Sequence, residues 1–87
     1  RIVFMGTPRA AATSLERLIS DEHDIAAVYT QPDRPAGRGK RLTSPPVKEL
    51  AVAAGLQVLQ PLKIRTPEAA AEFRSHDADV AVVVAYG

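Results

Sequence analysis

The residues of this 87-residue sequence best suited to chemistry lie in the basic segment 31–41, written QPDRPAGRGKR. Its cationic side chains are Arg34, Arg38, Lys40 and Arg41. An arginine presents a planar set of donors that fits phosphate groups and guanine edges. A basic loop beside an acidic body is suited to contact nucleic acid. A solvated surface loop explains the same residues, and physical reasoning alone supports the two interpretations equally.

The positive charge of the chain is concentrated in this region, although the net charge is only +1. Residues 31–48 hold five basic side chains against a single acidic one, Asp33. The rest of the chain holds six basic and nine acidic side chains. This asymmetry indicates a locally basic surface on an acidic body.

A second candidate is the Gly6-Thr7-Pro8 turn, which follows an apolar run. Backbone N–H groups at the start of a helix can hold an anion or polarise a substrate. The dinucleotide pattern G-x-G-x-x-G is absent because Gly6 stands alone, so a dinucleotide site is not expected. Capping of a helix by Thr7 would explain the turn without any ligand.

The remaining reactive side chains give weaker signals. His23 lies among acidic neighbours in a polar stretch, where a solvated turn is a better interpretation than a metal cluster. His76 is expected to close a helix, where partial positive charge suits the helix dipole. No cysteine is present, which excludes disulfides and thiolate chemistry. We expect no metal site and no catalytic residue in this chain.

Several elements must position these residues. Apolar runs predict strands at 2–5, 25–29, 56–59 and 80–85. Helical spacing predicts a helix from residue 11 with Ala12, Leu15, Leu18 and Ile19 buried, and a helix over 47–54 that buries Val47, Leu50, Ala51 and Ala54. A third helix follows Thr66-Pro67 and directs Ala69, Ala70 and Phe73 inward. Ser44 is expected to cap the second helix, Gly55 to end it, and residues 31–46 to form a long loop.

This alternation predicts an α/β fold, the first half of a Rossmann-like, doubly wound parallel sheet with the order β-α-β-α-β-α-β. Ligands of such folds bind outside the carboxyl ends of the strands. No signal-peptide pattern and no apolar run of membrane-spanning length occurs, so we expect a cytoplasmic protein.

Four segments in this order and spacing resemble methionyl-tRNA formyltransferases: RIVFMGTP at 1–8, QPDRPAGRGK at 31–40, PVKEL at 46–50 and VVVAYG at 82–87. The resemblance covers essentially the whole chain. It implies transfer of a formyl group from 10-formyltetrahydrofolate to the α-amino group of methionyl-tRNA in translation initiation, by an enzyme that is expected to be monomeric.

The resemblance also implies roles for individual residues. Arg34, Arg38, Lys40 and Arg41 would contact the tRNA acceptor arm, with Arg38 as the main recognition residue. Gly6, Thr7, Pro8 and Ala10 would lie near the aminoacyl end. Ala85, Tyr86 and Gly87 would begin the loop that shapes the folate pocket.

By the same resemblance, residues 1–87 are expected to be the N-terminal part of the formyltransferase domain. The catalytic asparagine, histidine and aspartate of the family would follow this part, and its β-barrel tRNA-binding domain is absent from these residues. We therefore expect the isolated 87 residues to be inactive.

The sequence departs from the family at Arg9 and Ala10, where an aspartate and a phenylalanine are usual. That phenylalanine helps to line the pocket for the methionine side chain, so the aminoacyl selectivity stays open. Two other functions are compatible with the pattern. One is an RNA-binding module without chemistry, and the other is a sister formyltransferase acting on a small amine or a nucleotide sugar.

Overall fold

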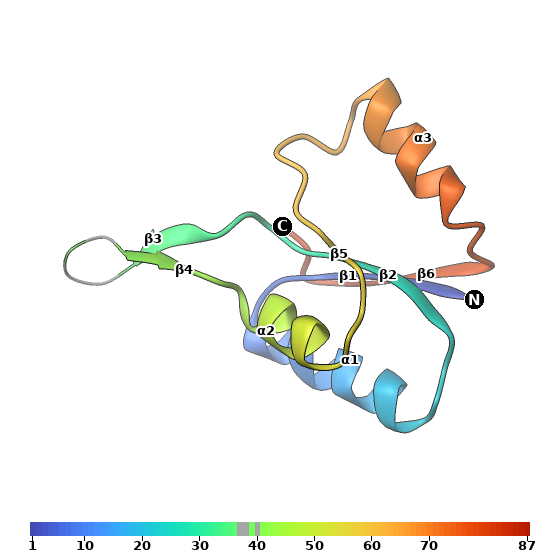
Figure 1. The fold of residues 1–87 in the computed structure, drawn as a ribbon, viewed down its shortest axis with the longest axis horizontal. Coiled ribbons are helices and arrows are strands. Elements are labelled where there is room, and N and C mark those ends of the chain that lie inside the picture. Colours follow the sequence, from blue (N-terminus) through green and yellow to red (C-terminus); the bar gives the residue numbers. More distant parts are fainter. Residues whose placement is uncertain (37–38, 40) are drawn as a thin grey trace.

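Four parallel strands form the main sheet of the residues that the structure describes. The structure is a computed structural model, and it describes residues 1–36, 39 and 41–87. The strands are β1 (Ile2–Gly6), β2 (Ile25–Tyr29), β5 (Val58–Leu59) and β6 (Val80–Val84). They lie in the order β5-β2-β1-β6 (Figure 1). Counted along the chain among themselves, this order is third, second, first, fourth, as in the first half of a doubly wound sheet. The predicted fold is therefore confirmed.

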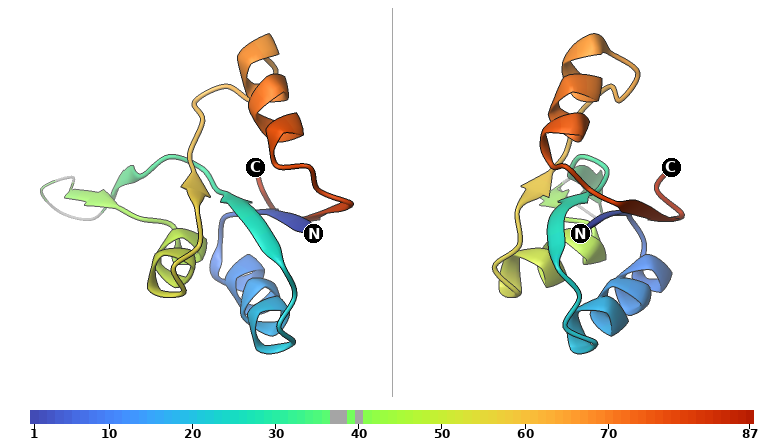
Figure 2. Two further views of the ribbon diagram at one scale, coloured as in Figure 1. Left: turned by 45° about the vertical axis from the view of Figure 1, so that its right-hand side comes forward. Right: turned by 90° about the vertical axis from the view of Figure 1, so that its right-hand side faces the viewer.

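Helices cover both faces of this sheet. Helices α1 (Arg9–Ser20) and α2 (Pro46–Ala53) lie together on one face, and α3 (Pro67–Ser75) lies on the other (Figures 1 and 2). Side chains of a strand alternate between the two faces, so a sheet covered on both sides buries every residue of a central strand. This explains why β1 is an unbroken apolar run rather than an alternating one.

Two apolar clusters follow from this arrangement. Phe4 and Val28 point toward α1 and α2, where they meet Leu15 and Val47. Tyr29, with Val3, Met5 and Ala27, points toward the other face and packs against Phe73. Each large apolar side chain buried in this way stabilises the fold by roughly 1.5–3 kcal/mol.

The starts of the helices differ in part from the prediction. Thr7 does not cap α1, because Pro8 is the residue before the helix and makes no side-chain cap. Ser44 does not cap α2 either, since Pro45 takes that position and the Ser44 hydroxyl donates to Asp33 instead. Thr66 does cap α3, accepting a 3.0 Å hydrogen bond from the backbone N–H of Ala69.

The segment 31–46 is more ordered than the predicted loop. Strands β3 (Arg34–Ala36) and β4 (Arg41–Thr43) pair antiparallel, with Arg34 opposite Thr43 and Ala36 opposite Arg41. This hairpin projects from the body beyond the ends of the sheet strands (Figure 1). The prediction of a loop without regular structure was therefore wrong for these six residues.

Smaller differences concern the ends of elements. Ala54 and Ala70 are exposed, so the predicted inward directions of both were wrong. Gly55 does end α2, in the left-handed conformation with φ of 74°. Strand β6 ends at Val84, one residue earlier than predicted, and its Val80 and Val83 are 52% and 60% exposed.

None of the helices in the part of the chain described here has the length and apolar character needed to cross a membrane.

Candidate functional site

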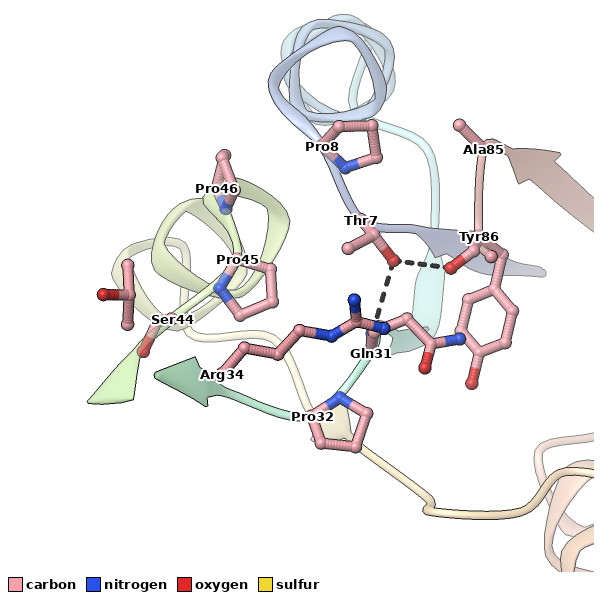
Figure 3. A pocket seen from close by; sticks show the side chains of 12 residues that line it. Thr7, Pro8, Gln31, Pro32, Arg34, Ser44, Pro45, Pro46, Ala85 and Tyr86 are labelled. Carbon is pink, nitrogen blue, oxygen red and sulfur yellow. Dashed lines mark hydrogen bonds between the residues drawn. The ribbon is translucent and has the colours of Figure 1, made fainter. Parts of the chain in front are cut away.

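An open pocket of about 410 Å³ lies where β1, β2 and β6 end (Figure 3). It is the kind of place at which ligands bind in doubly wound sheets, beside the point where the strand order reverses between β1 and β6. Its wall comes from three separate parts of the chain. The lining residues are Thr7, Pro8, Gln31, Pro32, Arg34, Thr43, Ser44, Pro45, Pro46, Ala85, Tyr86 and Gly87.

The hydroxyl of Thr7 joins these three parts. It donates a 2.7 Å hydrogen bond to the backbone carbonyl of Tyr86, after β6. It also accepts a 3.3 Å hydrogen bond from the backbone N–H of Gln31, after β2 (Figure 3). The sequence suggested that Thr7 caps a helix, but its hydroxyl instead links the segments that follow β2 and β6.

The backbone beneath the pocket is tightly packed at Gly6. A Cβ atom at this position would lie 2.7 Å from Cβ of Ala11 and 2.8 Å from both Phe4 Cε2 and the carbonyl oxygen of Val84. All three distances are shorter than van der Waals contact permits. Only glycine therefore lets α1 and β6 approach β1 so closely at the pocket floor.

The wall after β6 has an unusual backbone. Ala85 adopts φ of 48°, in the left-handed region that side chains with a Cβ disfavour. Burial raises the pKa of the Tyr86 hydroxyl, so this ring presents a neutral phenol to the pocket. The Tyr86 ring adds apolar surface to this wall, and Pro8, Pro32, Pro45 and Pro46 add apolar surface to the other parts of the pocket.

The opposite wall is fixed by Asp33, at the root of the β3–β4 hairpin. Its carboxylate accepts hydrogen bonds from Gln60 Nε2 at 2.7 Å and from Lys48 Nζ at 3.0 and 3.1 Å. Ser44 Oγ adds a longer bond of 3.4 Å. The bond from Gln60 first, and then that from Lys48, holds the pKa of Asp33 below its ordinary value. The sole acidic residue of the basic segment thus ties the hairpin to α2 and to the segment after β5.

The predicted basic residues fall in different places. Arg34 lines the pocket and extends into it (Figure 3). Arg41 is exposed on β4, opposite Ala36. Arg38 and Lys40 lie outside the described residues.

The other predicted site residues are brought together only in part. Thr7 and Pro8 share the pocket with Ala85, Tyr86 and Gly87. Gly6 is buried below the floor, and Ala10 is exposed on α1 outside the lining.

The sequence profile of the family described as formyl transferase matches residues 1–87, the whole chain. The chain belongs to the formyl transferase family. Among curated proteins it is similar to the methionyl-tRNA formyltransferase of Hydrogenovibrio crunogenus, at 54% identity over 87 residues. It is 56% identical to the protein of that name from Afipia carboxidovorans and 58% identical to that from Xanthomonas axonopodis pv. citri. All 87 residues align in each case, and the chain spans 28% of the length of each relative.

In this formyl transferase chain, sequence reasoning missed the residues that hold the pocket walls in place. Asp33 could have been found as the one acid in a basic segment. The anchoring role of Gln60 left no local signal, since its partners Gln31 and Asp33 lie 29 and 27 residues earlier.

A buried pair was missed on the other face of the sheet. His76, at the end of α3, is only 6% exposed, and its Nε2 lies 3.0 Å from the hydroxyl of Tyr29. Burial, with smaller effects from Glu72 and Tyr86, raises the pKa of Tyr29. The prediction that His76 ends a helix is confirmed, but no local sequence signal pointed to this partner.

Proposed function

We propose that the protein containing this chain transfers the formyl group of 10-formyltetrahydrofolate to the α-amino group of methionyl-tRNA. The observation that carries the proposal is the pocket itself. One of its walls is the Ala85–Gly87 segment and the other is the root of a basic hairpin. A reaction between a small donor and a large anionic acceptor needs these two surfaces side by side. The relatives are identical to this chain at more than half of its positions, and their name, methionyl-tRNA formyltransferase, supports formyl transfer to methionyl-tRNA.

The hairpin is proposed to contact the acceptor arm of the tRNA. Arg34 and Arg41 lie on its two strands, and the sequence adds Arg38 and Lys40 between them. Cationic side chains on a projecting hairpin suit phosphate contacts, because they can reach the phosphate backbone of the tRNA while the acidic rest of the chain stays farther from it. Anchoring by Asp33 supports this role, since a hairpin with a fixed root loses less freedom on binding.

The segment 85–87 is proposed to begin the donor site. The Tyr86 ring and the prolines of the pocket offer apolar surface to a flat ring system, while Thr7 and Gln31 offer polar groups. Thr7 and Pro8, with Gly6 and Ala10 nearby, are proposed to lie toward the aminoacyl end.

The chemistry proposed is acyl transfer without a metal. The amine of the acceptor attacks the formyl carbon, the bond from that carbon to N10 breaks, and the proton lost by the amine ends on the leaving nitrogen. The asparagine, histidine and aspartate that would stabilise the oxyanion and move this proton are assigned to residues outside these 87. We propose that the enzyme works as a monomer in the cytoplasm.

The direct test uses the protein that contains this chain, at its natural length, with methionyl-tRNA and 10-formyltetrahydrofolate. We expect formylmethionyl-tRNA to form, and no product with uncharged tRNA, which lacks the amine. Formylation of a small amine or nucleotide sugar instead would assign the chain to a sister formyltransferase. Binding of tRNA without formylation of any acceptor would leave only the RNA-binding module.

The role of the hairpin is tested separately with Arg34→Ala, Arg38→Ala and Arg41→Ala. Each variant should weaken tRNA binding and lower the slope of log affinity against log salt by about one phosphate equivalent, roughly 0.7–0.9. The affinity for tetrahydrofolate should stay unchanged in Arg38→Ala and Arg41→Ala; Arg34 lines the pocket, so its variant is left out of this comparison. Arg17→Ala is the matched control, because this exposed arginine pairs with Asp21 near the far end of α1. Equal losses of tRNA and folate affinity would contradict this division of roles.

A further inference from the structure

The structure assigns to Thr7 the role of a positioning residue that holds the two walls of the pocket at a fixed separation. The assignment deepens the proposed function, on which its consequence for donor binding rests. It concerns residues that are far apart in the chain: Tyr86 lies 79 residues after Thr7, and Gln31 lies 24 after it.

The Thr7 hydroxyl acts as donor and acceptor at once. Thr7 Oγ1 gives its proton to the Tyr86 carbonyl and accepts from the Gln31 N–H, with distances of 2.7 and 3.3 Å. A single oxygen that both donates and accepts at this reach is available only from serine or threonine among side chains of similar length. Valine has almost the same shape and makes neither bond.

The two bonds of this hydroxyl lead to different walls of the pocket. On one side, the carbonyl of Gln31 accepts a 3.1 Å hydrogen bond from Gln60 Nε2, whose other bond goes to Asp33 at 2.7 Å. The root of the hairpin is therefore linked to Thr7 through consecutive hydrogen bonds. On the other side, the bond to Tyr86 fixes the residue directly after Ala85.

The backbone of Ala85 is held in an uncommon conformation. Its φ of 48° lies in the left-handed region, which is unfavourable for a residue with a Cβ atom. Such a conformation persists only where surrounding contacts hold it. The Thr7 hydroxyl supplies a contact of this kind at the next residue. Without it, the 85–87 wall is expected to relax away from β1.

The experiment compares Thr7→Val with Thr7→Ser in the protein at its natural length. The first readout is hydrogen exchange of the backbone amides of residues 85–87 without ligand. The second is the dissociation constant for tetrahydrofolate, measured by calorimetry. Thr13→Val is the control, because the hydroxyl of this exposed threonine donates to the Arg9 carbonyl within its own helix, at 3.3 Å.

A net hydrogen bond changes an equilibrium constant by roughly 2- to 13-fold. For Thr7→Val we expect faster exchange at residues 85–87 and a dissociation constant raised by about tenfold. In turnover, KM for the donor should rise more than kcat falls. Thr7→Ser should restore both readouts to within about threefold, and Thr13→Val should change neither.

Unchanged exchange in Thr7→Val would overturn the assignment, whatever reaction the protein catalyses. So would a loss that Thr7→Ser fails to restore, because the methyl group and not the hydroxyl would then matter. Faster exchange with no change in folate affinity would overturn the positioning role as well. Failure of the proposed function is recognised separately, by the absence of formyl transfer in the unaltered protein.

Discussion

Gly6→Ala is the substitution with the most defined structural consequence. Gly6 lies where β1 ends, between α1 and β6. The added Cβ would come within 2.7 Å of Ala11 Cβ and 2.8 Å of the Val84 carbonyl oxygen. Neither neighbour is the far end of a flexible side chain, so relief requires movement of a helix or a strand.

The size of the effect follows from these distances. Carbon atoms in contact sit about 3.5–4.0 Å apart, so α1 or the end of β6 must retreat by roughly 1 Å. Inserting a methyl group into a packed site of this kind destabilises a fold by about 1–3 kcal/mol. A displacement of about 1 Å at a reacting geometry can lower a rate by about 100-fold. We therefore expect both the free energy of unfolding and kcat/KM to fall.

The assay pairs denaturant unfolding with steady-state formyl transfer by the protein at its natural length. Gly55→Ala is the matched control. Gly55 has φ of 74° and is not among the residues that line the pocket, and no atom of the described residues lies within 4 Å of the position that an added Cβ would take. Its replacement should destabilise the protein by about 1–2 kcal/mol through its backbone conformation alone and leave kcat/KM unchanged.

Two results would refute this reasoning. Wild-type stability and activity in Gly6→Ala would mean that the close packing at the pocket floor is not required. Equal activity losses in Gly6→Ala and Gly55→Ala would mean that activity follows stability rather than the geometry of the pocket.

Three further outcomes are expected. Thr30→Val should leave the free energy of unfolding unchanged or raise it by up to about 1 kcal/mol in a denaturant titration, because the buried Thr30 hydroxyl has no hydrogen-bond partner among the described residues. A clear loss of stability would contradict this. Tyr29→Phe should lower the free energy of unfolding by about 1–3 kcal/mol and speed proteolysis around α3, since His76 loses its buried partner. Unchanged proteolysis would show that the Tyr29–His76 pair does not hold the helix. The lowered pKa of Asp33 means that its stabilising effect is present above the ordinary carboxyl range and is lost as pH falls through the lowered pKa. Unfolding at a series of pH values should therefore show Asp33→Asn less stable than wild type near neutral pH and equal to it in strong acid, and a difference independent of pH would contradict this.

The main sheet could be predicted from sequence because its strands are continuous apolar runs. A residue such as Phe4 or Val28 is apolar whichever face it occupies, so the run itself marks a strand covered on both sides. The cap at Thr66-Pro67 was equally predictable, since a cap depends on residues three positions apart. These signals depend on residues that are close together in the sequence, so they can be read without knowledge of the tertiary structure.

The hairpin and the use of Thr7 could not be predicted in the same way. Strands β3 and β4 are three residues long each, too short for an alternating pattern to stand out, and β3 contains a proline. Their geometry depends on Asp33, whose partners come from α2 and from the segment after β5. Thr7 looked like a helix cap because its sequence neighbours fit that role. In the folded chain, Tyr86 and Gln31 use the same hydroxyl instead.

The position of β1 between β2 and β6 has a consequence for biosynthesis. Strand β2 follows β1 closely in sequence, whereas β6, which pairs with the other edge of β1, is the last of the four strands to be made. Ribosomes add about 5–20 residues per second, so roughly 3–10 s separate the synthesis of β2 from that of β6. Throughout this interval one edge of β1 lacks its partner β6, and the contact between Thr7 and Tyr86 cannot form. The nascent chain therefore brings these pocket walls together only as β6 docks, and a pause in translation before Val80 would prolong the exposure of an unpaired, aggregation-prone edge.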